Sequence, residues 1–240
     1  MAPRIDKLLD RRDEPRYGIK EAARSLGMSS ATLDTWVNGR KYPTNAGPRF
    51  FKPLISVAGP GRLSFYNLVE AHILLSTRKK HCVEIPAIRR ALDYVRKTYP
   101  SLHPLLSESF LTDGKDLFVK KILAATGEEQ TINVSSWGQL GLGPILDLYL
   151  RRIERDKSGL PVKLFPIRMN WPGDLNVDPP RVVVIDPEVS SGRPVVNGTG
   201  VMAEVIVGRF NTGEGIGSIA DDYGLQVSQI EEVIRYARAA

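Results

Sequence analysis

Cysteine and histidine are scarce in this chain of 240 residues. Cys82 is the single cysteine, which excludes an internal disulfide and any zinc site built from several cysteines. The three histidines, His72, His81 and His103, have no recognised metal-ligand spacing relative to one another or to Cys82. We therefore expect neither a metal nor a cofactor.

Long apolar runs are also missing. No segment approaches the roughly 20 apolar residues that a membrane-spanning helix needs. The opening MAPRIDKLLDRRDEPR contains no apolar stretch of signal-peptide length. The composition, with 42% hydrophobic and 25% charged residues, is that of a globular protein. We expect a soluble, cytoplasmic protein with no membrane partner.

Catalytic motifs are absent from the sequence as well. There is no nucleophile elbow and no kinase signature. The glycine-rich GEGIGS at 213–218 lacks the Gly-Lys-Ser/Thr ending of a phosphate-binding loop, so it favours the start of a helix. Asp186 and Glu188 lie in a proline-containing loop, where hydrogen bonds to the turn are their expected role. We do not expect an enzyme.

Positive charge is present but unevenly distributed. The net charge is +6, with a pI near 9.4. Residues 1–82 hold 15 basic and 7 acidic side chains, a net +8, whereas 83–180 hold 13 and 12, and 181–240 hold 5 and 8. The basic excess therefore lies in the first third, where it favours a polyanionic partner.

The elements expected in the first third are mainly helical. Residues 17–37 predict two short helices around a turn at Gly27, where only glycine adopts positive φ without penalty. Residues 41–64 predict a hairpin that turns at Gly59-Pro60-Gly61. One helix is expected over 64–80, and the apolar spacing from Ile85 to Tyr99 predicts another that ends at Pro100.

The rest of the chain mixes strands and helices. We expect strands at 116–123, 131–136, 162–168 and 181–186, a helix over 138–156, and a linker at 169–180. Three helices then close the chain, at 201–210, 214–222 and 228–238, the last with a capping box between Ser228 and Glu231. The fold class is α+β, divided into an N-terminal winged helix-turn-helix (1–82), a middle α+β segment (83–180) and a C-terminal helical domain (181–240).

The first helix pair has the spacing of a helix-turn-helix. Ala23 precedes Gly27 by four residues, Leu33 follows it by six, and Trp36 follows Leu33 by three. A small residue at the crossing, a glycine turn and apolar residues that pack back define this unit. A plain helical hairpin with a solvated basic surface is the alternative. We predict that the unit binds DNA, and the expected contacts are Ser29, Ser30, Thr32, Arg40, Lys41, Tyr42 and Arg62.

The same spacing recurs near the other end of the chain. Ala220 precedes Gly224 by four residues, Ile230 follows by six, and Val233 by three more. Glu231 and Glu232 lie on this second helix, and carboxylates that face phosphates repel them. We therefore interpret the C-terminal unit as an element for dimerisation or partner binding rather than for DNA.

The C-terminal third contains an ordered series of residues: Asp186, Pro187, Gly192, Pro194, Gly198, Thr199, Gly213, Tyr223, Tyr236 and Ala237. This series resembles a small bacterial domain long described only as a domain of unknown function, with a consensus like "DP.v..GkP.I.GTRi....i...f..G.s.eeia.dY.l....i..ai.Ya". Gly200 stands where that family often has arginine. Residues 17–66 separately resemble the winged helix-turn-helix of MerR-type regulators. The combination is similar to VapB-type antitoxins.

This resemblance implies a toxin–antitoxin pair. The chain would neutralise a VapC-type PIN-domain ribonuclease toxin and repress its own operator as a homodimer. A cationic side chain would suit an acidic, metal-binding cleft, and Arg193 and Arg209 are the candidates, although both also suit an ordinary surface. The alternatives are a stand-alone MerR-like regulator whose middle segment senses a ligand, and an enzyme that uses the middle segment.

Overall fold

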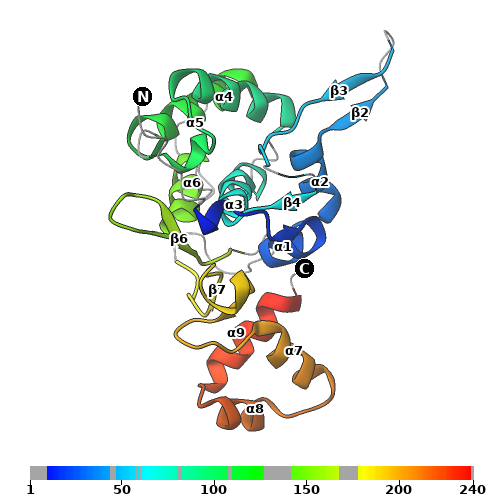
Figure 1. Ribbon diagram of the computed structural model, residues 1–240, viewed down its shortest axis with the longest axis vertical. Helices are drawn as coiled ribbons and strands as arrows, with labels where there is room; N and C mark the ends of the chain where they lie inside the picture. The colour runs from blue at the N-terminus through cyan, green and yellow to red at the C-terminus, as the bar shows by residue number, and fades with distance from the viewer. Residues whose placement is uncertain are drawn as a thin grey trace, which may run out of the picture.

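A long helix, α3 (Phe65–Lys79), runs through the centre of the larger part of the molecule (Figure 1). The computed structural model describes residues 10–43, 47–57, 59, 61–79, 83–107, 110–126, 142–167 and 178–238. A smaller part, formed by the C-terminal helices, lies below α1 in the same view. Every described sheet is a two-stranded antiparallel pair, so the α+β class is confirmed.

Helix α3 is buried around its whole circumference because apolar residues occupy all of its faces. Its start is fixed by reciprocal capping, in which the Ser64 backbone donates to Asn67 Oδ1 over 3.1 Å and the Asn67 backbone donates to Ser64 Oγ over 3.2 Å. The expected helix at 64–80 is thereby confirmed. Other helices surround α3, so it forms the core of the larger part.

The helix pair at the start of the chain has the expected geometry. Helices α1 (Ile19–Leu26) and α2 (Ser30–Asn38) are joined by Gly27, whose φ of 65° is left-handed. Ala23 is buried at the crossing, and Leu33 and Trp36 are buried on the return side. The two helices, the glycine turn and the buried face therefore lie where the spacing predicted them.

The expected hairpin is displaced along the chain. The paired strands are β2 (Arg40–Tyr42) and β3 (Arg49–Phe51), so the turn at Gly59 does not join them. Gly59 instead forms an isolated bridge to Arg62, and β4 (Arg62–Leu63) pairs with β1 (Tyr17–Gly18). Apolar and turn residues indicated strands here but not their partners, which tertiary packing selects.

One expected strand is a helix. Residues 116–123 belong to α5 (Lys115–Thr126), which packs against α4 (Ile85–Thr98). The run is rich in apolar and β-branched residues, but Phe118 and Ile122 are four apart and both are buried, which is the spacing of one helical face. The predicted helix that ends at Pro100 is confirmed by α4.

Short 3₁₀ and π turns complete this body. The segments are η1 (Arg11–Asp13), η2 (Pro104–Leu106) and the π turn η3 (Phe110–Gly114), which leads directly into α5. His103 binds η1 to α3: its Nδ1 lies 3.1 Å from Glu70 and its Nε2 lies 3.0 Å from Asp13. Burial opposes the imidazolium, but the two carboxylates outweigh it and raise the pKa of His103.

The middle of the chain continues the same core. Helix α6 (Leu142–Arg151) lies against α3, and β5 (Ile153–Arg155) pairs with β6 (Pro161–Leu164), where a strand was expected. The expected helix over 138–156 is thus shorter and ends before β5. The predicted strand at 131–136 and most of the predicted linker lie outside the described residues.

The C-terminal part has a separate apolar core. Strands β7 (Val183–Val184) and β8 (Val195–Val196) flank η4 (Ser190–Gly192) and lead into three helices. The predicted positions of these helices are confirmed by α7 (Ala203–Asn211), α8 (Ile216–Tyr223) and α9 (Val227–Arg238).

The capping box predicted at the start of α9 is wrong in its residues. The helix begins at Val227, and the Gln226 backbone donates to the Gln229 side chain over 2.9 Å. Ser228 and Glu231 are therefore already inside the helix, two positions too late to cap it.

The apolar clusters group the three expected regions differently from the sequence. One cluster runs from Tyr17 to Ile185 and includes both the first and the middle region, whereas a second extends from Val182 to Tyr236. The three-region division stays a prediction. No helix in the described ranges is long and apolar enough to cross a membrane.

Candidate nucleic-acid interface

The outer face of α2 presents hydroxyl groups at its first turn. Ser29 and Ser30 are exposed and Thr32 is half-buried, whereas Trp36 on the opposite face is buried. Ser29 stands at the N-cap, and its side chain makes no capping hydrogen bond. The start of α2 thus combines exposed hydroxyls with the positive end of a helix dipole, which suits an anion such as a phosphate.

Two further polar residues on this face were missed from the sequence. Asp34 and Asn38 are both exposed, and Asn38 Nδ2 donates to Asp34 Oδ1 over 2.8 Å. Their spacing of four residues after Ser30 places them along the same outer face. An exposed carboxylate there repels phosphate but accepts a hydrogen bond from cytosine N4, so it suits a base edge rather than the backbone.

The hairpin β2–β3 has two different faces. In the register of this pair, Arg40 lies opposite Phe51 and Lys41 lies opposite Phe50. The Tyr42 and Phe51 rings stack at 4.1 Å on the first face, and the Arg89 guanidinium of α4 lies 5.6 Å from the Phe51 ring. This face is therefore anchored to the body, and Tyr42 has a packing role that its sequence position did not indicate.

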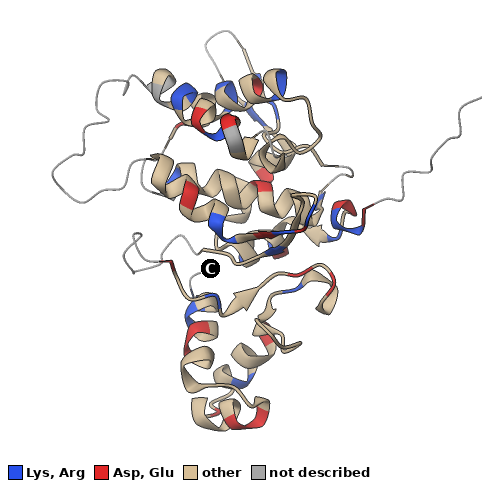
Figure 2. Cartoon of the chain, turned by 90° about the vertical axis from the view of Figure 1, so that its left-hand side faces the viewer, with Lys and Arg blue, Asp and Glu red and all other residues tan. Residues whose placement is uncertain are grey.

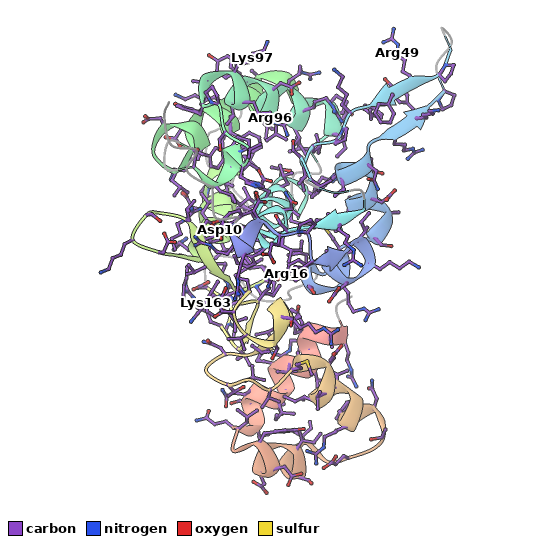
Figure 3. The ribbon with its side chains drawn as sticks, in the orientation of Figure 1. Asp10, Arg16, Arg49, Arg96, Lys97 and Lys163 are labelled. Atoms are coloured by element: carbon purple, nitrogen blue, oxygen red, sulfur yellow. The ribbon has the colours of Figure 1, made fainter. Side chains whose placement is uncertain are left out.

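The other face of the hairpin points away from these anchors. It carries Lys41 and Phe50, both exposed. Figure 1 shows the hairpin extending from the body beyond α2. Arg49, which Figure 3 labels on the hairpin, lies opposite Tyr42 in the register and so belongs to the first face. Phe50 is 53% exposed and was not among the residues predicted from the sequence.

The charge of this region is uncompensated. Between Asp34 and Glu70 the sequence has no acidic residue. Within the described ranges no ion pair involves any cation of this stretch, whereas Arg12 and Arg16 near the start of the chain both pair with carboxylates. The unpaired cations are Arg40, Lys41, Arg49, Lys52 and Arg62.

Arg62 lies apart from the hairpin cations. It is exposed on β4, beside Gly18 of β1, and its guanidinium is 3.5 Å from the Arg16 carbonyl oxygen. The sequence placed it on the same hairpin as Arg49, which is wrong because β4 pairs with β1 instead of β3. The remaining predicted cations, Arg40 and Lys41, do lie on the hairpin.

The second helix-turn-helix has the same backbone and a different surface. Gly224 between α8 and α9 has a φ of 61°, Ala220 is buried at the crossing, and Ile230 and Val233 are buried, as the spacing predicted. Its exposed side chains include carboxylates on both helices, and Figure 2 shows acidic residues on these lower helices. The exposed acids are Asp221, Asp222 and Glu231.

The two arginines proposed to contact a toxin are both engaged within the chain. Arg209 pairs with Glu214 and Asp222, and hydrogen bonds to Glu214 are the main reason why the pKa of Arg209 is raised. Arg193 lies 3.9 Å from Glu21 of α1 and 3.5 Å from Glu204 of α7. A partner would have to displace these carboxylates before either arginine bound it.

The C-terminal part docks on the back of the first helix-turn-helix. The Tyr236 hydroxyl of α9 donates to the Ser25 carbonyl of α1 over 2.8 Å, and the Gly192 backbone packs against the Tyr17 ring. A cavity of about 340 Å³ lies beside these contacts, between α1 and the helices α7 and α9. The contact with Tyr17 requires glycine, because a Cβ at Gly192 would lie 2.8 Å from Tyr17 Cζ.

These features define a class of protein. It is an α+β chain in which a helix-turn-helix with an unpaired basic hairpin is joined to a second helix-turn-helix with an acidic surface. Residues 183–237, which form the second unit, match the family described as "Protein of unknown function (DUF433)".

Several known proteins are similar to this chain over nearly its whole length. It is 30% identical over 234 residues to the Mycobacterium tuberculosis protein named "Putative antitoxin VapB45", covering 92% of this chain and 93% of that protein. It is 26% identical to the uncharacterized protein Rv2308 of the same organism, covering 94% and 91%. The crystal structure of Rv2018 from M. tuberculosis superposes with a TM-score of 0.63 at 28% identity, covering 96% and 100%. The chain therefore belongs to the family of VapB-type antitoxins.

Proposed function

We propose that this chain is the antitoxin of a toxin–antitoxin pair and that it represses its own operon by binding DNA. The protein would neutralise a VapC-type PIN-domain ribonuclease toxin and would bind its operator as a homodimer. The first helix-turn-helix and the β2–β3 hairpin would form a winged DNA-binding unit, and the C-terminal unit would bind the toxin or the second copy.

The basic hairpin is the observation that carries the DNA-binding part of the proposal. Its four cations are Arg40, Lys41, Arg49 and Lys52, and all are exposed without an ion pair in the described part of the chain. Phosphates would supply the missing negative charge, and counterion release would make binding strongly salt-dependent. The hydroxyls at the start of α2 lie next to this charge along the chain and suit groove contacts.

The toxin-binding part of the proposal rests on the family and on the division of charge. The relative is named "Putative antitoxin VapB45", and the C-terminal unit has an acidic outer surface that favours a partner other than DNA. Arg193 and Arg209 remain candidates for contact with a toxin, with the condition that their present carboxylate partners are released.

The first experiment is co-expression with the product of the adjacent gene. A stable complex and the loss of ribonuclease activity in that complex would support the antitoxin assignment. Absence of any association between the two purified proteins, at concentrations where both are folded, would refute it. The mass of the complex measured by light scattering would test the homodimer.

The second experiment measures DNA affinity as a function of salt. We expect Arg40→Ala and Lys41→Ala each to reduce the slope of log K against log[salt] by about one, because each removes one phosphate contact. Arg193→Ala provides a matched control, since it removes an exposed arginine from the C-terminal part. Unchanged slopes in both hairpin variants would show that the hairpin does not contact DNA.

A further inference from the structure

Phe50 is an exposed aromatic residue in the middle of a stretch of the chain that has cations and no acidic residue. It is 53% exposed on β3, directly opposite Lys41 of β2 and next in sequence to Arg49. Phe51 differs from it, because the Phe51 ring is stacked on Tyr42 and lies beside Arg89 of α4. The two neighbouring phenylalanines therefore face opposite sides of the hairpin, one toward the body and one away from it.

The Phe50 ring packs against the backbone of Gly39, at the end of α2. Gly39 has a φ of 74°, and a Cβ added there would lie 2.6 Å from Cζ of Phe50 and would overlap the Phe51 carbonyl oxygen. The missing side chain allows the ring to lie against the backbone, so its orientation is defined although half of it is exposed. An aromatic ring fixed in an exposed position loses little conformational entropy when a partner covers it.

The charge around Phe50 restricts what covers it. Lys41 lies directly opposite it in the register, Arg49 and Lys52 lie close to it in the sequence, and no acidic residue lies between Asp34 and Glu70. A second copy of the same hairpin would bring like charges together, which opposes self-association at this face. A polyanion with apolar surface between its charges fits better, and the minor groove of duplex DNA has that character.

We infer that Phe50 is an apolar DNA contact, which enters the minor groove beside phosphates bound by Lys41 on the same face of the hairpin. This inference rests on the proposed DNA-binding function and adds a residue of a different kind to it. Apolar side chains that enter the minor groove contact sugars and partly open a base step. Phe50 then contributes affinity that does not depend on salt, while the cations contribute affinity that does.

The separation of these two contributions gives the experiment. Binding to a duplex that carries the region upstream of the chain's own gene is measured over a range of salt concentrations for the wild type, Phe50→Ala, Phe50→Trp and Lys41→Ala. We expect Phe50→Ala to weaken binding about tenfold at every salt concentration, equivalent to 1.4 kcal/mol, with an unchanged slope. Lys41→Ala reduces the slope, and Phe50→Trp retains most of the affinity.

Two controls keep the result specific. Leu102→Ala removes an apolar side chain that is 72% exposed in the segment after α4, and we expect it to leave DNA binding unchanged. A minor-groove ligand such as netropsin, added as a competitor, should displace the wild type more effectively than Phe50→Ala. Circular dichroism and the mass in solution are compared for all variants.

Each outcome decides a different question. Failure of the wild type to bind the duplex refutes the proposed function itself. Wild-type binding with an unaffected Phe50→Ala refutes only the inference about Phe50. A change in the mass in solution for Phe50→Ala, with DNA affinity per protomer unchanged, shows that a second copy covers the ring and also overturns the inference.

Discussion

Gly192→Ala tests the contact through which the C-terminal part docks on the first helix-turn-helix. Gly192 ends the 3₁₀ turn of the loop that lies against Tyr17, and its φ is +78°. A methyl group there would lie 2.8 Å from Tyr17 Cζ and closer still to the hydroxyl oxygen. Tyr17 is 3% exposed and has little room to move. The substitution therefore combines backbone strain with a steric overlap.

The two contributions can be separated in magnitude. A left-handed conformation costs an alanine about 1 kcal/mol relative to glycine. Insertion of a methyl group into a packed contact costs roughly 1–3 kcal/mol more. Gly198 has nearly the same φ, +80°, with no atom within 4 Å of its added Cβ. Gly198→Ala should therefore lose about 1 kcal/mol and Gly192→Ala about 3 kcal/mol in the free energy of unfolding.

The assay is urea unfolding followed by circular dichroism and tryptophan fluorescence, with Trp36 buried in the core of the first helix-turn-helix. Tyr17→Phe removes the hydroxyl that the new methyl meets, so the Gly192→Ala/Tyr17→Phe double variant should recover part of the loss. The double-mutant cycle then gives a coupling energy between the two sites. Equal losses for Gly192→Ala and Gly198→Ala, with no coupling to Tyr17, would refute the close packing described here.

Three further substitutions test other parts of the structure. Arg152 is 1% exposed and donates hydrogen bonds to the Phe165, Pro179 and Pro180 carbonyls and to Asp178. Arg152→Met should therefore lower the free energy of unfolding, measured with urea, by about 3–5 kcal/mol. Arg151→Met changes the exposed neighbour and should lower it by less than about 1 kcal/mol. The pKa of His103 is raised above its usual value of about 6.5, so its contribution to stability is complete below that pH and disappears as the pH rises through the folded pKa. His103→Gln should therefore flatten the dependence of the urea midpoint on pH. A pH profile identical to that of the wild type would contradict this prediction. Tyr236→Phe should destabilise by about 1 kcal/mol through the lost bond to Ser25, and unaltered protease sensitivity of the C-terminal part would argue against that contact.

Both helix-turn-helix units were predictable from the sequence because their determinants are local. A glycine that requires positive φ fixes the turn, and residues at fixed offsets from it fix the buried face. Gly27 and Gly224 both adopt the left-handed conformation, with buried Ala23 and Ala220 four residues before them. Local rules of this kind need no information about the rest of the fold.

Features that depend on distant packing were not predictable in the same way. The strand propensity of residues 116–123 is overridden because α5 packs against α4, and the helix places Phe118 and Ile122 together on one buried face. The hairpin register is selected by Tyr42 stacking on Phe51, with Arg89 of α4 beside that ring. The exposure of Phe50 follows from that register, so sequence reasoning found the cations of the site and missed its aromatic residue.

The geometry of the docking contact separates the two candidate surfaces. The contacts between the C-terminal part and the first helix-turn-helix fall on β1 and α1: Tyr17 with Gly192, Glu21 with Arg193, and Ser25 with Tyr236. The exposed hydroxyls of α2 and the cations of the β2–β3 hairpin take no part in them. Two units with the same backbone geometry and opposite charge are thus joined through sides that carry neither charged surface. The basic surface and the acidic surface are therefore exposed at the same time. A partner bound at one surface therefore has no direct steric conflict with a partner at the other, so DNA-binding and toxin-binding variants should prove separable.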